Sequence, residues 1–230
     1  MNKDANFLAY VQMLDSALPI GGFSHSFGLE TYIQKGVIRS MEELEEYMNS
    51  QIHCSLVRLE GLAIKGMYQA MADNDLRRFC QLDSILHVQR PASESRDGQH
   101  KMGRRLLTLG RKLYPWMNFD ELEQALSDYQ AYGTVPALHT WIACSLGISS
   151  DDAVRGFLYS AVSVIAGSAL RLMSVGQTEC QLLISRGTSR IAEEWSKVCE
   201  LEPEQLHSFS PMQDIYAMNH ESLYSRLFMS

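Results

Sequence analysis

The stretch Ser150-Asp-Asp-Ala-Val-Arg-Gly-Phe-Leu-Tyr-Ser-Ala-Val-Ser-Val-Ile-Ala-Gly-Ser-Ala-Leu-Arg-Leu-Met-Ser174 carries apolar residues on nearly every face of a helix. A helix that is apolar all round is buried in a core. Gly156, Ser160, Ser163 and Gly167 recur at spacings of four, three and four, so they share one face. Small residues on one face let a neighbouring helix approach closely. We therefore predict a central buried helix over about residues 150–174.

Helical spacing continues on both sides of this stretch. Ser40 and Glu43 have the spacing of a capping box, and apolar residues follow at intervals of three and four as far as Met67. This pattern predicts one long amphipathic helix over about residues 40–72. Further helices are expected over 76–86, 102–113, 120–133, 136–147, 177–184 and 189–200, with a polar joint over 90–98.

The chain shows no internal repeat and no shift in composition that would mark a second domain. Its 230 residues are enough to bury a core without disulfide or metal staples. The expected fold is therefore all-α, a single-domain bundle of about eight to ten helices over residues 1–230.

Charge and cysteine usage exclude several classes of protein. The net charge of −7 argues against nucleic-acid binding, which needs clustered cations. The five cysteines are odd in number and form no C-x-x-C pair, which favours reduced thiols in the cytoplasm. No signal peptide is visible, and the apolar run 157–166 is shorter than the roughly 20 residues that cross a bilayer. We expect a cytoplasmic protein that does not insert into membranes.

Gly22-Phe-Ser-His-Ser26 superficially resembles the G-x-S-x-G nucleophile elbow, but its second glycine is missing and no strand precedes it. No histidine pair has the H-E-x-x-H spacing of a metal site. We therefore predict no catalytic residue, no metal site and no cofactor. Two alternatives stay open: a small helical hydrolase with Ser24 as nucleophile and His25 as base, and a direct metal carrier that uses His25, His220 or the cysteines.

The C-terminal segment has the composition of an interface anchor, because it combines tyrosines, an arginine and large apolar residues. Residues 216, 220, 223, 224, 227 and 228 lie close to helical spacing, which predicts a short amphipathic helix. This tail, over about 212–230, either docks on its own bundle or binds a partner.

Four segments together resemble the family of the urease accessory protein UreF. They are the opening Leu18-Pro-Ile-Gly-Gly-Phe-Ser-His-Ser-Phe-Gly-Leu-Glu30, the stretch Gln99-His-Lys-Met-Gly-Arg-Arg-Leu106, the element Val175-Gly-Gln-Thr178 with Gln181, and the closing His220-Glu-Ser-Leu-Tyr-Ser-Arg-Leu-Phe228. Four ordered segments are far more specific than any one of them, and the similarity spans essentially the whole chain.

The resemblance implies a dimeric, all-α scaffold without enzymatic activity of its own. In that family the protein works with UreD, called UreH in some organisms, and with the nickel-binding GTPase UreG on apo-urease. It implies that this chain bridges UreD/UreH and UreG during nickel insertion, regulates the GTPase step and forms a homodimer.

The same resemblance implies which residues meet partners. Gly21 and Gly22 allow the loop after the first helix to turn sharply and present its aromatic and polar side chains. The tail is expected to be mobile alone and to become helical against UreD, where Arg226 makes a charge-assisted contact. For Glu30 a role within the fold stays open beside partner recognition. The expected partner-binding residues are Phe23, Ser24, His25, Glu30, Gln177, His220, Glu221, Tyr224, Arg226, Leu227 and Phe228.

Overall fold

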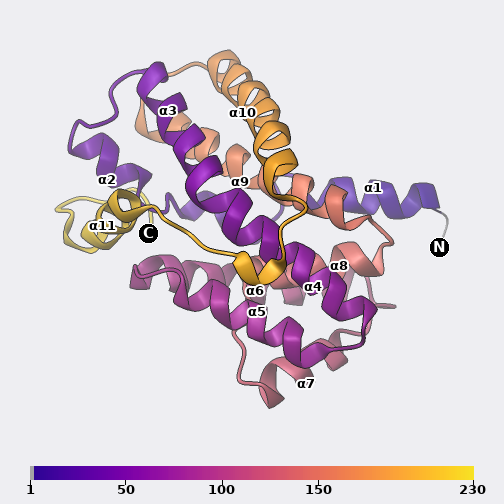
Figure 1. The fold of residues 1–230 in the computed structure, drawn as a ribbon. Coiled ribbons are helices and arrows are strands. Elements are labelled where there is room, and N and C mark those ends of the chain that lie inside the picture. The colour runs from indigo at the N-terminus through magenta and orange to yellow at the C-terminus, as the bar shows by residue number, and fades with distance from the viewer. Residues whose placement is uncertain (1–2) are drawn as a thin grey trace.

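The computed structural model describes residues 3–230, and within this range it contains helices and no strand (Figure 1). The α3 and α4 segments are joined without a break, so ten separate α-helices result and the predicted all-α bundle is confirmed. The segments are α1 (Lys3–Met13), α2 (Leu29–Gln34), α3 (Met41–Gln51), α4 (Leu62–Ala72), α5 (Leu76–Val88), α6 (Ser93–Leu113), α7 (Phe119–Asp128), α8 (Val135–Ser145), α9 (Ser150–Leu172), α10 (Gln177–Val198) and α11 (Pro211–Asn219).

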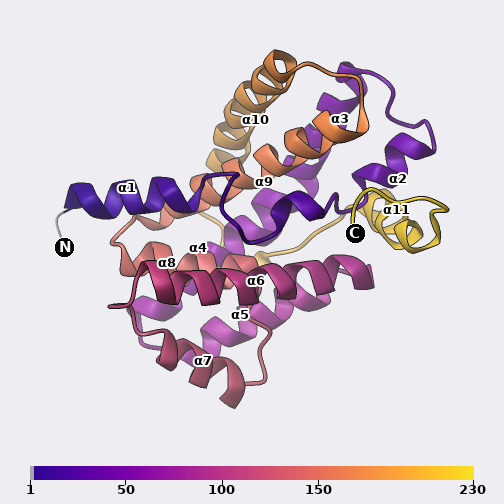
Figure 2. The same ribbon diagram turned by 180° about the vertical axis from the view of Figure 1, so that it is seen from behind.

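The central helix is α9, which packs against α4, α8 and α10 and lies in the middle of both overall views (Figures 1 and 2). It begins where the Ser149 side chain accepts a hydrogen bond from the Asp152 amide. Val154, Leu158 and Val162 follow at every fourth position and are completely buried. The prediction of a central buried helix is therefore confirmed.

The small residues of α9 do not act together as one seat for a neighbouring helix. A Cβ added at Gly156 would collide with the Tyr10 hydroxyl of α1, so this glycine does permit close approach. Ser160 instead lines an internal cavity, and a Cβ at Gly167 would meet nothing within 4 Å. The expectation of close helix approach holds for the first position of the stripe only.

The expectation that no apolar segment is long enough to cross a membrane is wrong for α9. With 23 residues this helix meets the length and composition of a membrane span. Half of its most apolar window is buried inside the protein, and the core helix of a helical domain meets the same criteria.

The predicted helix over residues 40–72 is present, but its middle is π-helical. The Ser40–Glu43 capping box starts α3, and π turns over Ile52–Gly61 lead into α4. A π turn holds more residues than an α turn, so the buried face shifts along the sequence. Leu56 is consequently half-buried, whereas Val57 enters the core. Period 3.6 alone does not predict this shift.

Several expected helix boundaries are wrong, among them the end of α7, which lies at Asp128 rather than near Gly133. Helix α6 begins at Ser93, inside the expected joint 90–98, because Pro91 restricts the residue before it and leaves the polar residues after it free to be helical. Helix α7 is capped by Asn118 rather than Asp120. Helix α10 is continuous rather than split, since Gly187 packs against Met48 and Val162 and no turn forms there.

The tail is helical only in its first half. Helix α11 packs against α2 and is followed by one 3-10 turn, His220–Ser222, after which residues 223–230 are not helical. The expected helix through Phe228 is therefore wrong. The amides of Leu227 and Phe228 donate to the Glu30 side chain instead of to a preceding helical turn. In this structure the tail docks on its own bundle.

Candidate functional site

Three of the four distinctive sequence segments meet at one place in the fold. They are the loop 18–30, the first half of α6 and the tail, whose end lies beside α11 and α2 in both views (Figures 1 and 2). Glycines allow this approach. A Cβ at Gly98 of α6 would lie 2.9 Å from Nδ1 of His25, and Gly21 has a φ of +91° beneath the Arg105 guanidinium.

Four charged side chains hold the tail, and we call Glu30, Glu94, His220 and Arg226 the tail clamp. The Glu30 side chain is 1% exposed and accepts hydrogen bonds from the amides of Leu227 at 2.7 Å and Phe228 at 3.0 Å. It also accepts one from Nε2 of His220 at 3.0 Å. Burial alone raises the pKa of Glu30, but the hydrogen bonds from Leu227, His220 and Phe228 outweigh it and lower that pKa.

His220 is completely buried between two carboxylates. Its Nε2 faces Glu30, and its Nδ1 lies 2.6 Å from Oε2 of Glu94. Arg226 donates to the other oxygen of Glu94 at 2.6 Å. Each ring nitrogen of His220 therefore faces one carboxylate, and Glu94 is shared between His220 and Arg226. The clamp thus joins Glu30 and Glu94 of the bundle to His220 and Arg226 of the tail.

The last residue of the tail is seated under the loop. The Ser230 carbonyl accepts from the amides of Ser26 and Phe27, at 2.6 and 3.0 Å, and from the Ser26 hydroxyl. The Ser230 hydroxyl bonds to Nδ1 of His25 at 2.7 Å. His25 is only 5% exposed, which contradicts its expected presentation on the surface. Burial, and then the charges of Lys101 and Arg105, lower the pKa of His25.

The predicted residues divide into a buried group and an exposed group. Phe228 is buried and carries the Arg171 guanidinium 4.3 Å above its ring, and Arg171 also donates to the Phe23 carbonyl. Phe23, at 66% exposure, Tyr224 and Leu227 face solvent on the same loop and tail. The buried residues anchor the tail, and the exposed ones are available to a partner.

Glu221 and Gln177 are both exposed but lie in different settings. Glu221 accepts a hydrogen bond from the Ser93 hydroxyl at the start of α6, so it flanks the tail clamp. Gln177 is the first residue of α10 and takes no part in the contacts described for the clamp or the loop.

The geometry bears on the two alternative functions. His25 bonds to Ser230, and Ser24 contributes its carbonyl to the Met229 amide at 2.8 Å, so the described contacts do not pair Ser24 with His25 as nucleophile and base. Within residues 3–230, no group of three or more His, Cys, Asp or Glu side chains is placed to hold a metal ion. The five cysteines are free thiols.

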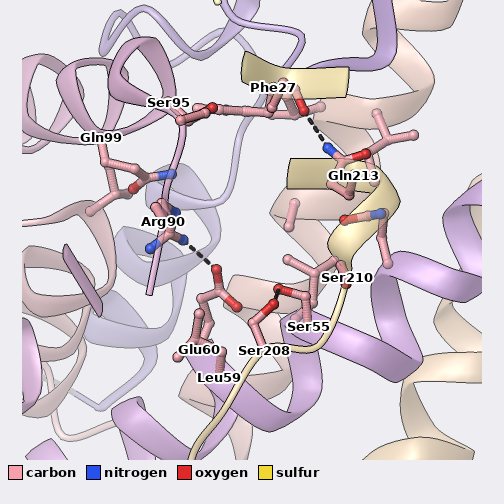
Figure 3. Close-up of a pocket in the computed structure, with 18 of the residues that line it drawn as sticks. Phe27, Ser55, Leu59, Glu60, Arg90, Ser95, Gln99, Ser208, Ser210 and Gln213 are labelled. Carbon is pink, nitrogen blue, oxygen red and sulfur yellow. Dashed lines mark hydrogen bonds and ion pairs between the residues drawn. The ribbon is translucent and has the colours of Figure 1, made fainter. Parts of the chain in front are cut away.

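A cavity of about 220 Å³ lies beneath the loop, α6 and α11 (Figure 3). Glu60 of the π segment and Arg90 form an ion pair at its wall. Across the cavity, Gln213 of α11 donates to the Phe27 carbonyl and so ties α11 to the loop. The loop and the start of the tail therefore lie over an internal cavity.

Sequence reasoning missed Glu94 and Glu60, two acids on which this region depends. Glu94 was hidden because residues 90–98 were expected to form a joint, although a helix starting after Pro91 would have placed it in the first turn. Glu60 falls within an otherwise apolar stretch of the long helix, which is a signal that a partner is required.

The chain is similar to known proteins over most of its length. The model of the UreF family matches residues 38–187. Over 227 residues the chain is 36% identical to a protein of Lachnoclostridium phytofermentans, covering 99% of this chain and 100% of that protein. It is 35% identical to a protein of Bacillus sp. strain TB-90, with 97% and 98% covered, and 33% identical to one of Haemophilus influenzae strain KW20, with 96% and 94% covered. All three are named urease accessory protein UreF.

Proposed function

Because this chain belongs to the UreF family of urease accessory proteins, we propose that it is a scaffold for nickel insertion that bridges UreD/UreH and the GTPase UreG on apo-urease. As an accessory protein it is not itself an enzyme. The observation that carries the proposal is the composite surface of loop and tail, where exposed aromatic and aliphatic side chains stand on the tail clamp.

This surface is suited to binding UreD. Tyr224 is completely exposed, and Phe23 and Leu227 are more than half exposed. Large aromatic and apolar side chains of this kind contribute much of the binding energy when a partner buries them. The tail clamp holds the backbone on which they stand, so little order has to be gained on binding. We assign direct contact to Phe23, Glu221, Tyr224 and Leu227, and a positioning role to Ser24, His25, Glu30, His220, Arg226 and Phe228.

A pull-down with UreD tests this assignment. Tyr224→Ala should weaken binding strongly, because a central aromatic contact is worth about 2 kcal/mol or more. Tyr129→Ala is a matched control, since Tyr129 is an exposed tyrosine directly after the end of α7. Equal binding of both variants and the unchanged protein would contradict the assigned surface.

A second face supports the homodimer. A groove of about 450 Å³ runs between α1, α9 and α10, and Val11, Tyr159 and Leu170 along it are exposed. Gly167 leaves open space there. Gln177 lies one turn before Gln181, which also lines the groove, so we place Gln177 at the rim of the dimer interface.

Light scattering after size-exclusion chromatography tests the dimer face. Leu170→Glu introduces a charge into the groove and should yield monomers at concentrations where the unchanged chain is dimeric. Leu113→Glu, on the equally exposed surface of α6, should leave the dimer intact. A dimer that tolerates Leu170→Glu would place the interface elsewhere.

We place the protein in the cytoplasm. The proposed role in nickel insertion is tested in cells that produce urease. Co-expression of a urease operon with and without this chain, followed by nickel analysis of purified urease, should show loss of nickel loading when the chain is absent. GTP hydrolysis by UreG should change on addition of the chain in the presence of UreD. Unaltered nickel loading and GTP hydrolysis would overturn the proposed function.

A further inference from the structure

The cavity beneath the loop has the size and walls of a small-molecule site. Its volume of about 220 Å³ exceeds the roughly 30 Å³ that one water molecule occupies in the liquid, so a molecule of several heavy atoms fits. Much of its wall is apolar, including Leu59, Phe157 and Val164, and a few polar side chains interrupt it. Ligand pockets commonly combine an apolar wall with a few converging polar groups.

The polar side chains of this wall are conspicuously short of partners. Ten buried side-chain nitrogen or oxygen atoms among residues 3–230 have no hydrogen-bond partner, and five of them belong to residues that line this one cavity. Buried polar atoms are rarely left without a hydrogen-bond partner, so the unpaired atoms indicate that a molecule binds in the cavity. The five atoms are Oε2 of Glu60, Oε1 of Gln99, Oγ of Ser160, Oγ of Ser210 and Oε1 of Gln213.

These atoms define the hydrogen-bonding character of the occupant. Each of the five is an oxygen that can accept, and the two amide oxygens and the carboxylate oxygen have no proton to give when Glu60 is ionised. Glu60 is 3% exposed and Gln99 is 8% exposed, so bulk water does not reach them freely. The occupant must therefore donate several hydrogen bonds.

The charged side chains of the cavity wall indicate the charge of the bound molecule. Among the described residues that line the cavity, Glu60 and Asp214 are acids and Arg90 is the base. Burial raises the pKa of both acids, and Arg90 opposes this rise in each case. One guanidinium serves two carboxyl groups, so a second positive charge would relieve the cost of burying them.

We propose that this cavity binds a small primary ammonium compound, with its ammonium group on Glu60 and Gln99 and its hydrocarbon part on the apolar wall. A primary ammonium donates three hydrogen bonds and accepts none, which matches the unpaired oxygens. The ligand would also stiffen the base of the loop and of α11, because Gln213 and Phe27 line the same space.

Titration of the purified full chain with n-butylammonium, followed by ligand-detected NMR, tests the proposal. Saturable binding to one site is expected. Tetramethylammonium carries the same charge without an N–H donor, and n-butanol carries a donor without the charge. Each should bind about tenfold or more weakly, because tetramethylammonium lacks the N–H donors and n-butanol lacks the charge that strengthens such hydrogen bonds.

Two variants locate the site. Glu60→Gln keeps the shape and removes the charge, so affinity should fall about tenfold or more. Glu60→Gln also leaves Arg90 without its ion-pair partner, so a second, independent variant is needed. Ala161→Leu fills the cavity, keeps every charge and should abolish binding. Glu42→Gln, at an exposed acid of α3, is the matched control and should bind as the unchanged chain does.

Three outcomes would overturn the proposal. The first is the absence of saturable n-butylammonium binding, which would mean that the cavity holds water only. The others are equal binding of tetramethylammonium and n-butylammonium binding that is unchanged in Ala161→Leu. Selective binding of n-butylammonium that both cavity variants weaken and Glu42→Gln does not would support it.

Discussion

Glu30→Ala should release the tail while leaving the helical bundle folded. The substitution removes the acceptor of four hydrogen bonds, three of them from the tail (the amides of Leu227 and Phe228 and the ring of His220) and one from the Gln34 side chain. It also leaves the buried His220 ring with Glu94 as its remaining carboxylate partner. Each buried polar group left without its hydrogen-bond partner costs about 1–3 kcal/mol. A loss of about 3 kcal/mol lowers the docking equilibrium roughly a hundredfold.

The loss of stability in Glu30→Ala should affect the tail alone, because the tail can detach from the bundle without unfolding it. Once detached, His220 and the two amides bond to water, so the loss is limited by the free energy with which the tail docks. The core of α9, whose buried residues do not touch Glu30 through any described hydrogen bond, should keep its packing. A small fall in melting temperature is therefore expected beside a large change at the tail.

Hydrogen exchange measured by mass spectrometry on peptides that cover residues 216–230 is the appropriate assay. Protection of the Leu227 and Phe228 amides should fall by about the same hundredfold factor, since exchange follows the open fraction. Glu42→Gln, at an exposed acid of α3, is the control and should change stability by less than about 0.5 kcal/mol. Unchanged protection in Glu30→Ala would refute the clamp.

The remaining predictions concern acid and packing. Because the pKa of Glu30 is lowered from its ordinary 4.5 on folding, tail docking is complete above pH 4.5 and is lost as the pH falls through the lowered value, which exchange at the tail amides should show. Burial lowers the pKa of His139 to about 4, so stability should decline between pH 6.5 and about 4, and His139→Gln should flatten that part of a plot of melting temperature against pH. Gly103→Ala should cost about 1–3 kcal/mol in denaturant unfolding, since its Cβ would collide with the Gly133 carbonyl, whereas Gly167→Ala, which meets nothing within 4 Å, should gain about 0.5–1 kcal/mol of helix propensity.

The helices that were predicted well are those whose pattern alone decides them. Ser40 and Glu43 cap α3 as their spacing indicates, and the apolar content of residues 150–174 marks α9 as the core helix. Periodicity states which face of a helix is buried, and burial of apolar surface is the dominant favourable term in folding. These features depend on neighbours within a few residues and can therefore be read locally.

The boundaries that were wrong depend on contacts far along the chain. A break was expected between residues 184 and 189, but Met48 and Val162 pack against Gly187 there, and α10 continues. The tail had helical spacing, yet its amides find Glu30 almost two hundred positions away. A tertiary acceptor can replace the helical one, and local propensity carries no information about it.

The candidate site was predicted in its parts but not in its construction. Glu30, His220 and Arg226 were named, and the structure joins them through Glu94, which was not. Phe23 and Tyr224 are exposed as a docking surface requires, whereas His25 is buried under the loop. Their assignment to partner binding stays a prediction.

The sequence by itself determined the helical class, the buried central helix, the membership of the UreF family and the two segments that form the exposed surface. Only the tertiary structure decided which acids face His220, that the tail rests on its own bundle, and that a cavity with unpaired oxygens lies beneath the loop. The reason is physical. Spacing along a chain specifies which side of each element is apolar, whereas the pairing of buried charges and the space left between helices depend on how the elements pack in three dimensions.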